Sequence, residues 1–153
     1  ELFPAPCDLA EVVARAVPQV YPPPHDRLQL NLPADLPLIH ADRQRLEVVV
    51  RNLIENSVKY TAQGTPITLS ASMNNGTVIV QVSDQGPGIP ETDHQRIFDA
   101  FFRVEDSLTR QSGLGLGLAI CQGFIQAQGG RIWLEPQPQG TCIAFSLPVE
   151  VGG

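Results

Sequence analysis

Two runs of alternating residues, joined by Asn74-Asn75-Gly76, predict an antiparallel β-hairpin in the middle of the chain. In the first run, Ile67, Leu69 and Ala71 alternate with polar residues. The second run, residues 77–83, has the same period of two and is rich in β-branched side chains. Asn and Gly readily adopt the positive φ angles of a tight hairpin turn. The pattern therefore predicts a sheet with at least one buried face.

The turn that follows this hairpin, Asp-Gln-Gly-Pro-Gly-Ile-Pro at residues 84–90, is a candidate binding site. Gly86 and Gly88 have no Cβ, so a ligand can come close to the main chain, while two prolines stiffen the turn. The carboxylate of Asp84 can accept a hydrogen bond from an amino group of a flat ligand, a contact worth about 1.5 to 3 kcal/mol. The alternative is an Asx turn, in which Asp84 bonds its own backbone two residues on. The turn alone leaves both interpretations open.

The longest helical pattern begins at Asp42 and runs to about Tyr60. Its apolar face is formed by Leu46, Val49, Val50, Leu53, Ile54 and Val58. A polar arc on a neighbouring side of the helix contains Asn52, Glu55, Asn56, Lys59 and Tyr60. Amide oxygens can coordinate a hard cation, and lysine and a phenol can contact phosphate oxygens. The arc predicts such a site, with an ordinary solvated face as the alternative.

A glycine-rich stretch, residues 113–118, leads into a helical pattern that stops at Gly129-Gly130. Free N–H groups and the positive end of the helix dipole favour a phosphate at such a helix start. The polar residues 104–112 before it lack a period and predict a mobile loop. A dinucleotide-binding glycine motif fails, because Leu118 or Ile120 would have to be small and no strand precedes it. A P-loop fails too, because Lys59 is the sole lysine.

Shorter patterns predict the remaining elements. They are a helix from Asp8 that ends before Pro18, an alternating strand through Leu28, Leu30 and Leu32, a short apolar run at 36–39, and two strands at 131–135 and 141–147. An aromatic cluster at helical spacing contains Ile97, Phe98, Phe101 and Phe102 and is followed by Arg103. Core packing alone would explain the cluster.

Length and composition bound the class of protein. A chain of 153 residues with 42% hydrophobic and 17% charged residues is expected to form one domain, and no apolar run is long enough to span a membrane. A net charge of −6 argues against a nucleic-acid surface. Cys7, Cys121 and Cys142 lack metal-ligand spacing and are expected to be buried thiols in a reducing compartment. The start at Glu1, without a signal peptide, leads us to expect a fragment of a longer protein.

Five segments in order resemble the N, G1, F, G2 and G3 boxes of the catalytic ATP-binding domain of sensor histidine kinases, in the GHKL superfamily. They are Asn-Leu-Ile-Glu-Asn-Ser-Val-Lys-Tyr at 52–60, Asp-Gln-Gly-Pro-Gly-Ile at 84–89, Phe-Asp-Ala-Phe-Phe-Arg at 98–103, Gly-Leu-Gly-Leu-Gly-Leu at 113–118, and Gly-Thr at 140–141. The resemblance covers nearly the whole chain. It implies an α+β two-layer sandwich, with a mixed, mostly antiparallel sheet of about five strands packed on about three helices, as one domain over residues 1–153.

The resemblance also implies the site and its cofactors, ATP and Mg²⁺. Asn52, Lys59 and Arg103 correspond to catalytic positions, Asn56 to the Mg²⁺ ligand, and Asp84 to the group that binds the adenine amino group. The implied nucleotide contacts are Asn52, Asn56, Lys59, Tyr60, Asp84, Gly86, Gly88, Ile89, Phe98, Arg103, Gly113, Leu114, Gly115, Leu116, Gly117, Leu118 and Thr141. Ser57 and Leu114 depart mildly from the family pattern, where alanine and a small hydroxyl residue are usual.

The phospho-accepting histidine of the family lies on a separate dimerisation helix pair, and none of His25, His40 and His94 has that context. The implied partners are therefore ATP, that helical domain of the same kinase and a downstream response regulator, without nucleic acid or direct membrane contact. We expect the fragment to be monomeric and cytoplasmic. It could also be the cytoplasmic part of a membrane-bound sensor.

Three other functions remain open on the same fold. ATPases of the gyrase, chaperone or mismatch-repair type place a glutamate four residues before the metal asparagine, where this chain has Asn52, and an amide cannot act as a general base. Glu55 does not match that position, so we assign it no catalytic role. A protein serine kinase needs no attached histidine domain. A regulatory module that binds nucleotide without transfer is the remaining alternative, against which the intact boxes argue.

Overall fold

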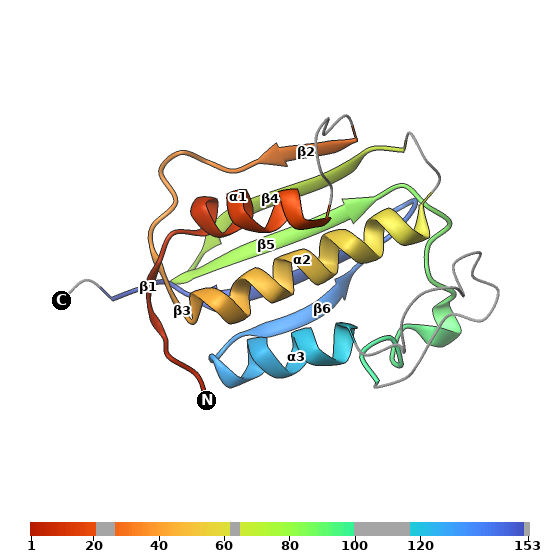
Figure 1. Cartoon of the computed structure of the whole chain (residues 1–153). Coiled ribbons are helices and arrows are strands. Elements are labelled where there is room, and N and C mark those ends of the chain that lie inside the picture. The colour runs from red at the N-terminus through yellow and green to blue at the C-terminus, as the bar shows by residue number, and fades with distance from the viewer. Residues whose placement is uncertain (21–26, 62–64, 100–116, 152–153) are drawn as a thin grey trace.

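A computed structural model describes residues 1–20, 27–61, 65–99 and 117–151. This part of the chain forms two layers, a five-stranded sheet and three α-helices that cover one of its faces (Figure 1). The sheet order is β2 (Leu28–Asn31), β4 (Ile67–Asn74), β5 (Thr77–Asp84), β7 (Cys142–Pro148) and β6 (Arg131–Glu135). β2 runs parallel to β4, and the other neighbours are antiparallel. The predicted fold class is confirmed.

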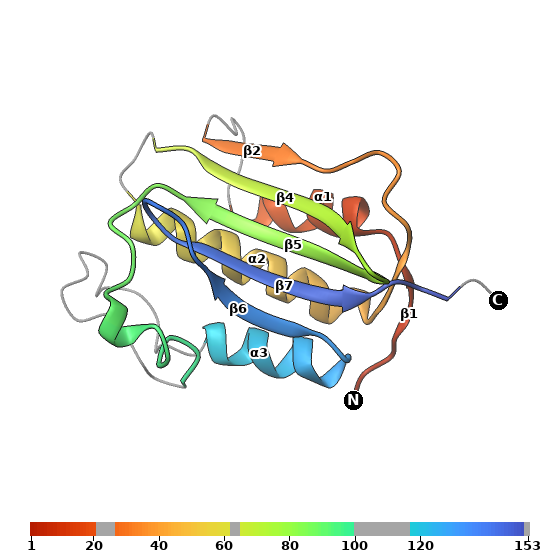
Figure 2. The same cartoon turned by 180° about the vertical axis from the view of Figure 1, so that it is seen from behind.

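The helices are α1 (Leu9–Val20), α2 (Arg43–Tyr60) and α3 (Gly117–Ala127), with a short 3₁₀ helix at Glu91–Asp93. Seen from behind, the strands pass in front of α1 and α2, α2 runs along the middle strands, and α3 lies beside β6 (Figure 2). A separate two-stranded sheet pairs β1 (Ala5–Cys7) with β3 (Ile39–Ala41). β1 was not predicted, because three residues that include Pro6 are too few to display an alternating pattern.

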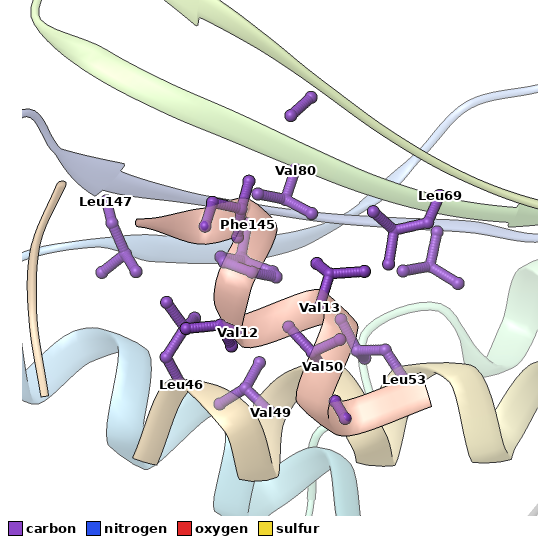
Figure 3. Packing of buried hydrophobic residues seen from close by; sticks show 14 of the residues in the cluster. Val12, Val13, Leu46, Val49, Val50, Leu53, Leu69, Val80, Phe145 and Leu147 are labelled. Carbon is purple, nitrogen blue, oxygen red and sulfur yellow. The ribbon is translucent and has the colours of Figure 1, made fainter. Parts of the chain in front are cut away.

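The core lies between the helices and the sheet. Val12 and Val13 of α1 and the apolar face of α2 point at the inner side chains of the middle strands (Figure 3). These inner side chains include Leu69, Val80 and Phe145, which are almost completely buried. Each such side chain contributes about 1.5 to 3 kcal/mol to stability. The predicted apolar face of the long helix is therefore confirmed, and it fixes α2 against β5.

One local prediction was wrong. α1 does not end before Pro18 but continues to Val20, because a proline in the last turn forfeits only the hydrogen bond to Ala14, which is exposed and can be solvated. The aromatic cluster is described only at Ile97 and Phe98, where the chain forms successive turns, with bonds from Arg96 N to Asp93 O and from Asp99 N to Arg96 O. Phe101, Phe102 and the loop predicted at 104–112 lie outside the described residues.

The three cysteines are free and buried, as predicted. Within the described ranges, no helix has the length and apolar character that a membrane span requires.

Candidate functional site

The hairpin places Asp84 at the end of β5. Asn75 and Gly76 have φ values of 50° and 82°, so the predicted turn with two positive φ angles forms. Burial alternates along β5, and Asp84 falls on the same face as Val80 and Val82, the face that packs against α2. Only 5% of Asp84 is exposed. The alternation along β5 thus places a carboxylate at the last of the strand's inward-facing, buried positions.

The two carboxylate oxygens of Asp84 have different partners. Oδ1 accepts hydrogen bonds from the backbone N–H groups of Gly86 at 2.9 Å and Thr141 at 3.2 Å. Oδ2 accepts one longer bond, from Ser57 Oγ at 3.3 Å. The Asx turn that the sequence left as an alternative is therefore present, but it uses only Oδ1. Oδ2 retains the capacity to accept a further hydrogen bond from a ligand.

The ionised form of Asp84 is disfavoured by burial. Burial raises the pKa of this carboxyl above its ordinary value, and the backbone N–H groups of Gly86 and Thr141, the Ser57 hydroxyl and the positive charge of Arg27 only partly offset that effect. A ligand N–H group that bonds Oδ2 would favour the ionised form. A buried carboxyl with a perturbed pKa at the end of a strand marks this position as a candidate binding site.

The turn between β6 and β7 closes against the backbone of Asp84. Gly140 has a φ of 80°, and a Cβ there would lie 2.0 Å from the carbonyl oxygen of Asp84. Gly88 has a φ of 82°, and its Cβ would lie 3.3 Å from the carbonyl oxygen of Gly140. The Asp84 N–H donates to Thr141 O at 2.8 Å. Two glycines are therefore needed for these loops to touch, and Thr141 contributes through its backbone.

Gln137 is a residue of this site that the sequence did not reveal. Its Nε2 donates to the carbonyl oxygens of Asp84 at 2.8 Å and Gln139 at 2.6 Å, and its Oε1 accepts from Ser83 Oγ at 2.9 Å. The side chain thus ties the β6–β7 turn to the end of β5. No spacing rule could have found it, because its partners at the end of β5, Ser83 and Asp84, lie more than 50 positions away.

The polar arc of α2 lies beside the start of α3. Asn52 is partly buried, and its side-chain carbon Cγ lies 3.9 Å from where Gly117 would carry a Cβ. The thiol of Cys121, one turn further along α3, donates to the carbonyl oxygen of Val49 in α2 at 3.9 Å. Asn56 and Lys59 are likewise partly buried, with Lys59 in the last turn of α2. The C-terminal half of α2 therefore connects the start of α3 with Asp84.

These elements meet at one edge of the molecule. The C-terminal end of α2, the end of β5 and the start of α3 all lie on the right in Figure 1. Three predicted site groups, Asp84, Asn52 and Gly117, are thus brought to the same edge from segments far apart in the sequence. The first N–H groups of α3 carry the partial positive charge that favours a phosphate.

The structure describes some of the remaining predicted site residues and not others. Gly86 lies in the Asx turn, and the carbonyl oxygen of Ile89 is 2.8 Å from Nε2 of His94. Phe98 and Leu118 pack against the core. Arg103, Gly113, Leu114, Gly115 and Leu116, and the side chain of Tyr60, lie outside the described residues. Their assigned roles stay predictions.

Comparison with known proteins identifies the family. The family model described as "Histidine kinase-, DNA gyrase B-, and HSP90-like ATPase" matches residues 41–151. The adaptive-response sensory kinase SasA of Synechococcus sp. (strain CC9902) is 40% identical over 127 residues, which cover 82% of this chain and 33% of that protein. The mycobacterial sensor histidine kinase MprB has a TM-score of 0.84 at 26% identity, covering 97% of this chain and 100% of that chain. Full-length ShkA, solved in complex with AMPPNP, has a TM-score of 0.80 at 30% identity, covering 99% of this chain and 32% of that chain.

The chain spans about a third of the length of the curated relatives it matches. The matched residues include α2, the Asp84 turn, α3 and the β6–β7 turn, which are the elements that build the edge described above. The chain therefore belongs to the family of histidine kinase-, DNA gyrase B- and HSP90-like ATPases, as a catalytic ATP-binding domain of the sensor histidine kinase kind.

Proposed function

We propose that this domain binds Mg-ATP and donates the γ-phosphoryl group to a histidine of a separate dimerisation domain in a two-component sensor kinase. The observation that carries the proposal is the buried carboxylate of Asp84, whose Oδ1 holds the turn while Oδ2 has the capacity to accept a further hydrogen bond from a ligand. The same edge gathers the amides of α2 and the start of α3. The adenine amino group and the phosphates of one nucleotide fit these two parts.

The adenine end of the site would be formed by Asp84 with the glycine turns. Asp84 Oδ2 would accept from the adenine amino group, while Gly86, Gly88 and Thr141 shape the wall through their backbone. Ile89 and Phe98 would add apolar contacts to the base. The complex of ShkA with AMPPNP supports a nucleotide in this fold.

The phosphate end would be formed by α2 and the start of α3. Asn56 would ligate Mg²⁺ with its amide oxygen, and Asn52, Lys59, Tyr60 and Arg103 would contact the phosphates. Mg²⁺ usually takes one or two protein ligands beside phosphates and water, so a single asparagine fits this ion. No cluster of three or more His, Cys, Asp and Glu side chains exists in the described residues that would suggest another metal site. When bound, Mg²⁺ supplies charge neutralisation at the phosphates.

Transfer would then depend on positioning. The nucleophile is a histidine imidazole presented by the helical partner domain for in-line attack on the γ-phosphorus, and the protein contributes orientation and positive charge from Lys59 and Arg103. Asn52 stands where a water-activating glutamate would be needed, which argues against an ATPase. A response regulator would take the phosphoryl group downstream. We also propose a cytoplasmic, monomeric state for this domain by itself.

Calorimetric titration with ATP, with and without Mg²⁺, tests the binding step. Wild type is expected to bind, and Asp84→Asn is expected to weaken binding by about tenfold or more, the equivalent of 1.4 kcal/mol. Asn56→Ala should abolish the Mg²⁺ dependence. Asp35→Asn, an exposed carboxylate outside the site, is the matched control and should bind like wild type. Wild-type protein that binds nucleotide in neither condition would contradict the proposal.

A further inference from the structure

We propose that Arg27 is a positioning residue that keeps the carboxylate of Asp84 ionised and oriented for the adenine amino group, an inference that rests on the nucleotide-binding function proposed above. Arg27 precedes β2 and lies outside every motif of the sequence analysis. Only 8% of it is exposed, which is unusual for arginine. A buried guanidinium must be hydrogen-bonded and its charge compensated.

The guanidinium of Arg27 holds the C-terminal end of α2. Its Nε donates to the carbonyl oxygen of Thr65 at 2.9 Å, and its Nη2 donates to the hydroxyl of Thr61, the residue that caps α2. The Arg27 backbone accepts a hydrogen bond from Ile67 N at 2.9 Å. One side chain thus links the start of β2, the end of α2 and the start of β4.

From Thr61 the contacts continue to Asp84. Thr61 Oγ1 donates its proton to the carbonyl oxygen of Ser57 at 2.7 Å, so it accepts the hydrogen bond from Arg27. Ser57 Oγ in turn donates to Asp84 Oδ2 at 3.3 Å. Oδ2 is the oxygen that the Asx turn leaves available for a ligand. Arg27 therefore sets the position of the helical turn that orients this oxygen.

The charge of Arg27 acts on the same carboxylate. Among the described residues, both acceptors that hold the guanidinium are neutral, so its charge is not cancelled at the point of contact. Arg27 is the charged side chain whose field lowers the pKa of Asp84 against the opposing effect of burial. The other titratable neighbour, Cys142, stays neutral, because burial and the charges of Glu135 and Asp84 raise the pKa of its thiol to about 11.

The test measures ADP affinity without Mg²⁺ for wild type, Arg27→Lys, Arg27→Met and the control Arg131→Met. Arg131 is an exposed arginine stacked on Trp133 of β6, away from Asp84. Because Mg²⁺ is left out, the measured ADP affinity does not depend on the metal site and reports the adenine end. Arg27→Met should weaken ADP binding at pH 6 by about tenfold, the loss expected when one hydrogen bond to the charged Oδ2 is no longer well oriented. Arg27→Lys keeps the charge and should retain most of the affinity, and Arg131→Met should bind like wild type.

The pH profile separates a charge effect from a packing effect. In Arg27→Met, the loss of ADP affinity relative to wild type should be greatest at the lowest pH and should shrink as pH rises, because a higher pH ionises Asp84 without the positive charge of Arg27. Affinity that matches wild type at pH 6, or a loss that is equal at every pH, would overturn the role of Arg27. If wild type and Asp84→Asn bind ADP equally, the proposed site itself fails. Thermal unfolding shows whether each variant folds, and if Arg27→Met does not, Arg27→Gln, which also removes the charge, is measured in its place with the same expected profile.

Discussion

Asp84 illustrates a conflict between stability and binding at the level of one residue. Burial raises the pKa of its carboxyl in the folded protein above the unfolded value of 3.8. The group therefore contributes most to stability below that value, and this contribution is lost as pH rises through the folded pKa. At neutral pH, the ionised carboxylate lowers the free energy of unfolding. This ionised state is the one that a hydrogen bond from an adenine amino group would stabilise.

Asp84→Asn should for this reason raise the melting temperature at pH 7 by about 2 °C or more while it weakens ADP binding. The amide oxygen can still accept from Gly86 N and Thr141 N, and the amide nitrogen can donate to Ser57 Oγ, so the turn keeps its hydrogen bonds. Thermal unfolding between pH 4 and 8 measures the effect, with Asp35→Asn as control. A lower melting temperature at pH 7 would show that the carboxylate stabilises the free protein.

Individual site residues were predictable only where they lay in contiguous patterns. Asp84, Gly88 and Gly140 stand in short motifs whose backbone requirements are visible in the sequence, and the structure shows those requirements. Arg27 and Gln137 act on the same turn through partners that lie more than 30 positions away. Periodicity carries no information about such pairs, because they depend on how β2 and the β6–β7 turn are placed by the sheet.

At the level of elements, α2 begins at a residue with several roles. Asp42 is its N-cap, with Oδ1 accepting from Arg45 N at 3.1 Å, and its Oδ2 accepts from Phe3 N at 2.8 Å. Burial by itself would raise the pKa of Asp42, but the backbone N–H groups of Phe3, Arg45 and Gln44 outweigh it and lower the pKa below 3.8. One carboxylate thus joins the N-terminal segment to the start of the longest helix.

Asp42→Ala should lower the free energy of unfolding at pH 7 by about 1 to 2 kcal/mol, the usual loss for an N-cap. Because the folded pKa is depressed, the stabilisation is present above the unfolded value and is lost as pH falls through the folded pKa. Urea unfolding at pH 7 and pH 3 should therefore show a difference from wild type that shrinks in acid. ADP affinity should not change, because Asp42 lies at the opposite end of α2 from Ser57 and Asp84. An equal difference at both pH values would exclude the charge as the cause.

The β6–β7 turn makes a sharper prediction about backbone contact. In Gly140→Ala, the new Cβ would lie 2.0 Å from Asp84 O at a φ of 80°, so the free energy of unfolding should fall by about 3 kcal/mol or more and ADP binding should be lost. Gly129→Ala is the matched control. Gly129 has a φ of 85° but open space around its Cβ position. The substitution Gly129→Ala should therefore lower the free energy of unfolding by only about 1 to 2 kcal/mol and leave ADP binding intact. Chemical unfolding and calorimetry compare the two, and similar losses in both variants would contradict the close approach.

The long elements and the short strand β6 were predictable, whereas β1 and the last turn of α1 were not. The period of α2 and the turn residues of the β4–β5 hairpin determined their structure locally. α3 also ends as predicted, with Gly129 at a φ of 85°. β1 depends instead on its pairing with β3, and the last turn of α1 depends on solvent around Ala14. Such features are decided by tertiary contacts, which overrule weak local preferences.

At the level of the whole molecule, the arrangement separates the proposed nucleotide site from His40 but not from His94, which lies beside Ile89. Asp84 and the start of α3 lie at one edge, whereas His40 belongs to β3 at the other end of the molecule (Figure 1). His40 Nδ1 pairs with Glu150 at 2.7 Å, and His94 Nε2 lies 2.8 Å from Ile89 O. Neither histidine stands on an α-helix of the described structure. The proposed function accordingly takes the phosphoryl acceptor to be a histidine of the separate dimerisation domain.

Incubation with γ-labelled ATP and Mg²⁺ should accordingly leave the domain unlabelled by itself, and addition of a dimerisation helical domain in trans should produce acid-labile, base-stable label on that partner. Lys59→Met should reduce the label by about 10- to 1,000-fold, as removal of a charge-stabilising group in phosphoryl transfer does, whereas His40→Gln should not. Acid-stable label on a partner would indicate a serine kinase, and release of free phosphate without label would indicate an ATPase. Binding of ATP without label on a partner and without release of phosphate would indicate a regulatory module. All four functions, histidine kinase, serine kinase, ATPase and regulatory module, begin with bound ATP, so only the fate of the γ-phosphate distinguishes them.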